Sequence, residues 1–227
     1  MRAAIYFTPP AGAPLTRAAA EWLGRSAFDG EPTRPGDDWL DPLVEAPARY
    51  GFHATVKAPF RLADDVDLVD LDARLAAFCD SRENVSVEQL VIARLGSFFA
   101  LVPEAQPAAL SELADAVVRT FEPLRAPTSE AEIRRRNPER LTERQREQLE
   151  QWGYPYVFDD FRFHMTLTGS VEPKDAAAVE ARMRAHFDGL DGAPLAIDRL
   201  AVFVEPERGT PFRLHSMHPF AAPQRPA

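Results

Sequence analysis

Two histidine–threonine pairs occupy matching positions in the two halves of the sequence. Residues 50–56 read YGFHATV and residues 161–167 read FRFHMTL, so each string has the order aromatic-His-x-Thr-aliphatic. On a β-strand, side chains at i and i+2 point to the same face. Each string therefore predicts a strand with a histidine and a threonine on one face and apolar side chains on the other. Two such strands that meet would build one polar site from two halves.

This combination of side chains is suited to acid–base chemistry at a phosphodiester. The unperturbed pKa of histidine is about 6.5, so one imidazole can take a proton from an attacking water or hydroxyl while the other, as imidazolium, gives a proton to the leaving oxygen. Threonine hydroxyls can donate hydrogen bonds to the non-bridging phosphoryl oxygens, on which negative charge builds up. We therefore predict that His53, His164, Thr55 and Thr166 are catalytic. One such string alone is typical of a structural histidine, and the matched pair is what favours catalysis.

Five further side chains near the motifs are candidates for substrate binding. Strand alternation places Lys57 on the face of the first motif, and Arg162 and Thr168 on the face of the second. Two tyrosines precede the second motif, and their rings can stack on a base or sugar, with packing as the alternative. The predicted substrate-binding residues are Lys57, Arg162, Tyr154, Tyr156 and Thr168.

A metal site is the alternative use of the second histidine. Asp159, Asp160 and His164 are residue types that bind metal ions. The spacing of four between Asp160 and His164 needs a helix, however, and the alternation of apolar residues predicts a strand. We therefore predict no metal and no other cofactor.

The elements that must position these residues follow from hydrophobic periodicity. Alternation predicts strands, and apolar positions three and four residues apart predict helices. The predicted strands are 2–8, 51–59, 85–94, 98–103, the second motif, 193–205 and 210–218. The predicted helices are 15–25, 69–80, 108–121 and 173–187, and residues 28–48 are predicted to be an irregular connection. Hairpins are expected for 85–94 with 98–103 and for 193–205 with 210–218, which makes the halves imperfect copies of one α+β unit.

Residues 128–151 form a segment dominated by arginine and glutamate. One interpretation is a solvated pair of helices, in which Thr142 caps the second helix and Gln145 completes a capping box. The other is a lid whose arginines meet a phosphorylated substrate. The sequence leaves both open.

Composition limits the possible partners. The net charge is −9, which argues against a large nucleic-acid footprint but allows a small phosphorylated ligand in a locally positive cleft. No apolar run is long enough to cross a membrane, and the apolar start of the chain is broken too early, by Pro9 and Pro10, for a signal peptide. The lone Cys79 excludes internal disulfides. We therefore expect a cytoplasmic protein, with its oligomeric state left open.

Longer strings around the motifs carry a family resemblance. They are Ile5–Pro9, Tyr50–Phe60, Trp152–Val157 and Phe161–Gly169. The paired His-x-Thr-aliphatic strings resemble the signature of the two-histidine phosphoesterase superfamily. The longer strings resemble one bacterial branch of it, of unknown function, whose genes lie beside those of phosphonate metabolism.

The resemblance implies an α+β fold of two pseudo-symmetric lobes, each with antiparallel strands and outer helices, around a central cleft. It implies a single bilobal domain over residues 1–227, with halves at roughly 1–127 and 152–227 and a charged helical insertion at about 128–151. It also implies metal-independent chemistry at the two His-x-Thr motifs. The predicted function is a phosphoesterase that acts on a small cyclic or linear phosphodiester, such as a nucleotide-derived or phosphonate-related metabolite. The alternative is a module that binds a nucleotide or phosphorylated metabolite in the same cleft without turnover.

Overall fold

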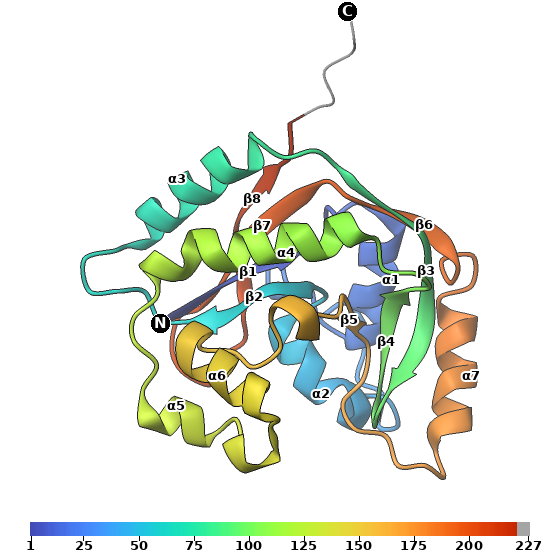
Figure 1. Cartoon of the computed structure of the whole chain (residues 1–227). Helices are drawn as coiled ribbons and strands as arrows, with labels where there is room; N and C mark the ends of the chain where they lie inside the picture. The colour runs from blue at the N-terminus through green and yellow to red at the C-terminus, as the bar shows by residue number, and fades with distance from the viewer. Residues whose placement is uncertain (222–227) are drawn as a thin grey trace, which may run out of the picture.

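The computed structural model describes residues 1–221 and contains one antiparallel sheet of eight strands (Figure 1). The strand order is β6-β3-β4-β5-β2-β1-β7-β8. The strands are β1 (Arg2–Phe7), β2 (Ala54–Phe60), β3 (Val85–Leu95), β4 (Phe98–Pro103), β5 (Met165–Thr166), β6 (Ala193–Ile197), β7 (Arg199–Glu205) and β8 (Arg213–Pro219). The predicted α+β class is therefore confirmed.

Helices pack on this sheet and extend beyond it. They are α1 (Pro14–Leu23), α2 (Asp41–Tyr50), α3 (Leu68–Cys79), α4 (Ala108–Phe121), α5 (Glu130–Arg134), α6 (Glu143–Trp152) and α7 (Ala176–His186), with short 3-10 turns at Glu122–Leu124, Pro138–Arg140 and Phe158–Asp160. In Figure 1, α5 and α6 lie at the lower left and α7 lies at the right edge. Within residues 1–221, no helix is both long and apolar enough to span a bilayer.

The two motif strands are neighbours in the middle of the sheet. β2 and β5 are antiparallel, with Ala54 opposite Met165, and β5 pairs on its other side with β4. Ala54 and Met165 are fully buried in the main apolar core, together with Val56 and Leu167. Burial of this back face follows from the alternation of the motif strings, and it leaves the His-x-Thr side chains on the front.

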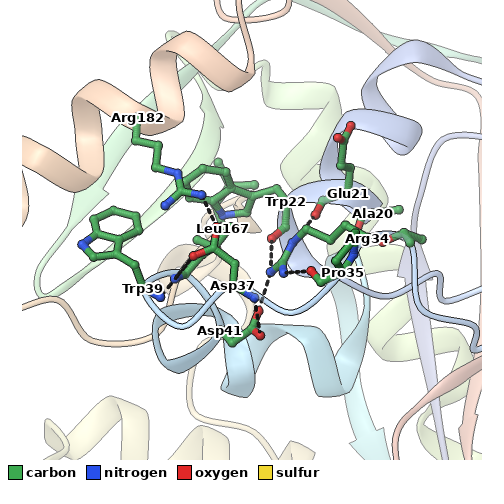
Figure 2. A network of polar contacts seen from close by, with 12 residues as sticks. Ala20, Glu21, Trp22, Arg34, Pro35, Asp37, Trp39, Asp41, Leu167 and Arg182 are labelled. Atoms are coloured by element: carbon green, nitrogen blue, oxygen red, sulfur yellow. Dashed lines mark hydrogen bonds and ion pairs between the residues drawn. The ribbon is translucent and has the colours of Figure 1, made fainter.

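A contact from α1 holds the chain directly after β5, at the last residue of the second motif. The indole Nε1 of Trp22 donates a hydrogen bond of 2.8 Å to the carbonyl of Leu167. Arg34 in turn donates to the carbonyls of Glu21 and Trp22, which lie in the last turn of α1, and forms an ion pair with Asp41 (Figure 2). The final carbonyls of a helix lack intrahelical partners, so this guanidinium satisfies groups that the helix itself cannot.

The structure differs from the sequence predictions in three places. Residues 41–50 form α2 rather than an irregular connection, which Pro42 permits because it lies in the first turn, where a missing N–H costs nothing. The predicted strand 193–205 divides at Asp198, and its first part, β6, pairs with β3 on the far edge instead of joining the β7–β8 hairpin. The second motif strand is only two residues long.

The strand order also shows how the two halves of the sequence contribute to the sheet. On one side of the β2–β5 pair lie β1, β7 and β8, and on the other side lie β4, β3 and β6. Counted with β2, the first side has four strands, and counted with β5, the second side also has four. Each of these groups combines strands from both halves of the chain. The residues of the predicted insertion form α5 and α6, and the predicted capping box between Thr142 and Gln145 is present.

The hydrogen bond between Trp22 and Leu167 generates a stability prediction. Trp22→Phe removes the indole donor but keeps an aromatic ring, leaving a buried carbonyl without its partner. We expect the free energy of unfolding to fall by about 1–3 kcal/mol, measured by urea denaturation. The matched control is Trp39→Phe, since Trp39 is 42% exposed, and this change should be close to neutral. Equal effects of the two substitutions would contradict the assignment.

Candidate functional site

The strand register brings the four motif side chains into one group. Extending the Ala54–Met165 pairing by one residue in each direction sets His53 opposite Thr166, and Thr55 opposite His164. Opposite residues in an antiparallel pair share a face, and diagonal neighbours are about 7–8 Å apart. The two histidines therefore stand diagonally across the strand pair, each beside a threonine of its own motif and facing a threonine of the other.

Both imidazoles are anchored in the same way. Nδ1 of His53 lies 2.8 Å from the carbonyl of Gly51, and Nδ1 of His164 lies 2.8 Å from the carbonyl of Arg162. A carbonyl can only accept a hydrogen bond, so Nδ1 carries a proton in each ring. When the ring is neutral, Nε2 is therefore the basic atom, and when the ring is charged, Nε2 carries the proton that can be given away.

His53 lies in an apolar aromatic setting. Its ring stacks on that of Tyr6 with a centroid distance of 3.8 Å, and the ring of Tyr50 lies 6.1 Å away. Burial lowers the pKa of His53 to about 4; the hydrogen bond to the carbonyl of Gly51 opposes this shift and the charge of His164 adds to it. His53 is therefore neutral near pH 7. Its Nε2 lies 3.2 Å from the hydroxyl oxygen of Thr55.

His164 occupies a different setting. Its anchoring hydrogen bond is exposed, whereas that of His53 is partly buried, and the aromatic ring beside it is that of Phe98, at a centroid distance of 5.9 Å. The two histidines thus share an anchoring geometry while differing in their surroundings. A pair of like groups in unlike environments can divide the roles of acid and base.

Two cavities open onto the pair. The first, of about 360 Å³, is lined by His53, Thr55 and Thr166 and is called the His53 cavity. The second, of about 470 Å³, is lined by His164 and Thr55 and is called the His164 cavity. Thr55 and Tyr154 line both cavities. The site is therefore a double recess of the size that small ligands occupy.

Lys57 does not share the front face with Thr55, so that part of the sequence prediction is wrong. Lys57 pairs with Ile5 while Thr55 pairs with Tyr6, so adjacent residues of β1 face residues two apart on β2. This bulge turns Lys57 toward α4. Its ammonium is 2.9 Å from the carboxylate of Glu122, and its side chain is 4% exposed.

The other predicted binding residues divide into two groups. Tyr154, Tyr156 and Arg162 all line the His164 cavity, as the sequence order before the second motif indicated. Thr168 lines the His53 cavity, but its hydroxyl is occupied: it accepts from the N–H of Phe99 at 2.9 Å and donates to the carbonyl of Gly169 at 2.8 Å. Thr168 therefore holds β4 against the second motif, and its contact with substrate stays a prediction.

The alternative metal ligands are engaged elsewhere. Asp159 and Asp160 lie in a 3-10 turn, and Arg144 of α6 forms ion pairs with both carboxylates. Across the described residues 1–221, no three His, Cys, Asp or Glu side chains gather as a metal-binding group.

Sequence reasoning missed several residues of the site. Tyr6, Tyr50, Arg2 and Arg136 all line the His53 cavity. Tyr6 and Phe7 are adjacent in the first strand, and only the pairing of Tyr6 with Thr55 shows that Tyr6 is the one that lies on the front face. Arg136 belongs to the charged segment, where one arginine among many gave no signal of its own.

Comparison with known proteins places the chain among relatives. A family model described as "Protein of unknown function (DUF1045)" matches residues 55–213. A protein of Janthinobacterium sp. (strain Marseille), named ribose 1,5-bisphosphate phosphokinase PhnN, is 36% identical over 230 residues, covering 97% of this chain and 51% of that protein. A protein of Laribacter hongkongensis (strain HLHK9) with the same name is 37% identical over 217 residues, covering 94% and 50%. The chain spans about half the length of these curated relatives.

A solved structure shares the fold. The protein TT0787 of Thermus thermophilus aligns with a TM-score of 0.51 and 13% identity, covering 97% of this chain and 98% of that one. At this level of identity the likeness concerns the fold, and it agrees with the architecture that the motifs predicted.

The setting of His53 generates a titration prediction. By NMR, the imidazole of His53 should titrate with a midpoint near pH 4, well below the usual value of about 6.5. Because the unfolded chain then binds more protons than the folded one between these values, stability should fall as the pH drops through this window. His53→Gln should remove both the resonance and this part of the pH dependence. A midpoint near 6.5 would contradict the burial of the ring.

Proposed function

The chain belongs to the family described as protein of unknown function (DUF1045), which is the branch that its motifs indicated, and we propose that it hydrolyses a small cyclic or linear phosphodiester. The proposed catalysis uses the two histidines and no metal ion. The observation that carries the proposal is the pair of imidazoles on neighbouring strands, each with Nδ1 bound to a backbone carbonyl and Nε2 left for chemistry. A binding site alone does not need two titratable groups anchored in the same way.

The different surroundings of the histidines support a division of labour. His53, neutral at pH 7, takes a proton from water at Nε2, and the water oxygen attacks phosphorus. The bond from phosphorus to the leaving oxygen breaks, and Nε2 of charged His164 gives that oxygen its proton. Attacking and leaving oxygens lie on opposite sides of phosphorus in such a displacement. The diagonal placement of the two rings is consistent with that geometry.

The threonines act on the charge that develops during this step. Thr55 and Thr166 flank the space between the imidazoles and are half-buried. Their hydroxyls donate to the non-bridging oxygens, where a fixed donor in a partly dry cavity stabilises the transition state more than water would. Thr55 also contacts Nε2 of His53 in the free protein, so substrate binding exchanges one hydrogen bond for another.

A small phosphorylated sugar is the substrate class that we favour. The relatives are named for ribose 1,5-bisphosphate, and we carry over only the chemistry of a compact, phosphorylated molecule. Phosphokinase activity is not carried over. The phosphate-binding motif G-x-x-x-x-G-K-[ST] does not occur in this sequence, and the chain matches about half of each relative.

Substitution of the histidines tests the proposal. With ribose 2,3-cyclic phosphate as substrate and EDTA present throughout, His53→Ala and His164→Ala should each lower kcat by about 10²–10⁴-fold. The double variant should lose little more, because groups that act as a unit are not additive. Thr55→Val should cost about 3–4 kcal/mol of transition-state stabilisation.

His215→Ala is the matched control, since His215 lies on β8, is exposed and lines neither cavity. It should keep the activity of the unmodified protein. Near-full activity in either catalytic histidine variant would refute the mechanism. Tight phosphate binding without turnover of any diester would favour the non-catalytic binding module instead.

A further inference from the structure

A third cavity lies beside the His53 cavity, between the β1–β2 region and the charged segment of α5 and α6. Its volume is about 350 Å³, and we call it the basic cavity. Arg2, Tyr50, Arg136 and Tyr154 line both the basic cavity and the His53 cavity. Tyr154 also lines the His164 cavity. A ligand at the two histidines could therefore reach the basic cavity past these shared side chains.

The basic cavity concentrates positive charge in an acidic protein. Eight arginine and lysine side chains line it, against the single carboxylate of Glu132, whereas the whole chain has a net charge of −9. Two further carboxylates, Glu205 and Glu122, each pair with two of the eight cations, and Glu132 pairs with Arg61 at 3.6 Å. Eight cations against three carboxylates leave an excess of five positive charges.

Three arginines of the cavity supply this free charge. Arg135, Arg136 and Arg208 are exposed and form no ion pair within the described residues 1–221, and the Nε of Arg135 donates to the carbonyl of Ala131 at 3.0 Å. Arg136 instead lies over the ring of Tyr154, with its guanidinium carbon 4.9 Å from the ring centroid. In addition, the buried Nε of Arg49 has no hydrogen-bond partner. A cavity lined by more guanidinium and ammonium groups than carboxylates is suited to an anion.

Ordinary pairing within an arginine-rich segment does not account for this arrangement. Arg134 has a partner within its own helix, Glu130, and Arg144 pairs with Asp159 and Asp160. Neither of these arginines lines the basic cavity. Arg136, in contrast, lines the cavity and has an aromatic ring rather than a carboxylate beside it, so its charge is available to a ligand there.

We propose that the basic cavity binds a phosphate monoester carried by the substrate, while the diester of the same molecule lies between His53 and His164. The link to the diester rests on the proposed function. A monoester carries up to two negative charges at neutral pH, and arginine forks bind its oxygens in pairs. The charged segment then forms one wall of a site that selects the substrate. This modifies the second interpretation of the segment, in which its arginines meet a phosphorylated substrate as part of a lid.

Binding of inorganic phosphate tests the site without any turnover. Calorimetry is carried out on His53→Ala/His164→Ala, which lacks the imidazoles, and on the same protein with Arg135→Ala/Arg208→Ala added. The added changes should weaken phosphate binding about tenfold or more, because each lost hydrogen bond to a charged group carries roughly that factor. Arg134→Ala/Arg140→Ala removes the same charge from exposed positions outside the cavity and should change the affinity far less. Equal effects of the two double changes would overturn the proposal.

Turnover tests the link to the substrate. The protein with both histidines should prefer ribose 2,3-cyclic phosphate that carries a 5-phosphate over the same diester without it, as a ratio of kcat/KM. Arg135→Ala/Arg208→Ala should reduce this ratio about tenfold or more, and Arg134→Ala/Arg140→Ala should not. An unchanged ratio would overturn the assignment of the cavity to a substrate phosphate. If no diester is hydrolysed, the proposed function fails, and the phosphate-binding comparison still decides whether the anion site exists.

Discussion

The pairing of Ala54 with Met165 joins the two motif strands, and the arrangement of the site depends on its register. A slip by one residue would turn His53 and Thr55 toward the core. β5 is too short to hold this register alone. Its other neighbour, β4, pairs with both of its residues, and the chain after it is fixed by Trp22 and by the hydroxyl of Thr168. Contacts outside the site therefore maintain the geometry within it.

A second constraint on the proposed mechanism is that two like imidazoles must take different roles, which requires different surroundings. Burial lowers the pKa of His53, whose ring stacks on Tyr6, while the anchoring hydrogen bond of His164 is exposed and its ring lies beside Phe98. The same backbone anchor serves both rings, so the protein varies the surroundings and keeps the orientation. Positive charge is gathered in the adjacent basic cavity, which His53 does not line.

The sequence predicted the parts of the site that depend on strand alternation. His53, Thr55 and their counterparts fall on one face because the period of a strand is two, and the helix at 108–121 follows from its apolar spacing. Lys57 escaped this reasoning because a bulge interrupts the period. α2 escaped it because Pro42 and Pro47 resemble breakers of a helix, although the first lies where proline is tolerated.

Features that depend on distant pairing were beyond the sequence. Nothing local at Ala193–Ile197 indicates that β6 pairs with β3 on the far edge of the sheet, and alternation cannot reveal which strands of the two halves share a group. The basic cavity likewise arises from segments far apart in the chain, such as Arg2, Arg136 and Arg208. The sequence shows that these residues are positively charged, but only the fold shows that they line one cavity.

The central claim is that one phosphoryl group is held by both imidazoles. A crystal structure with orthovanadate, which mimics the geometry of phosphoryl transfer, tests it most directly. We expect one vanadate between the strands, with Nε2 of His53 and Nε2 of His164 on opposite sides of it and the hydroxyls of Thr55 and Thr166 on its equatorial oxygens. Vanadate that contacts only one histidine, or that binds elsewhere with the space between the rings open, would contradict a shared phosphoryl site.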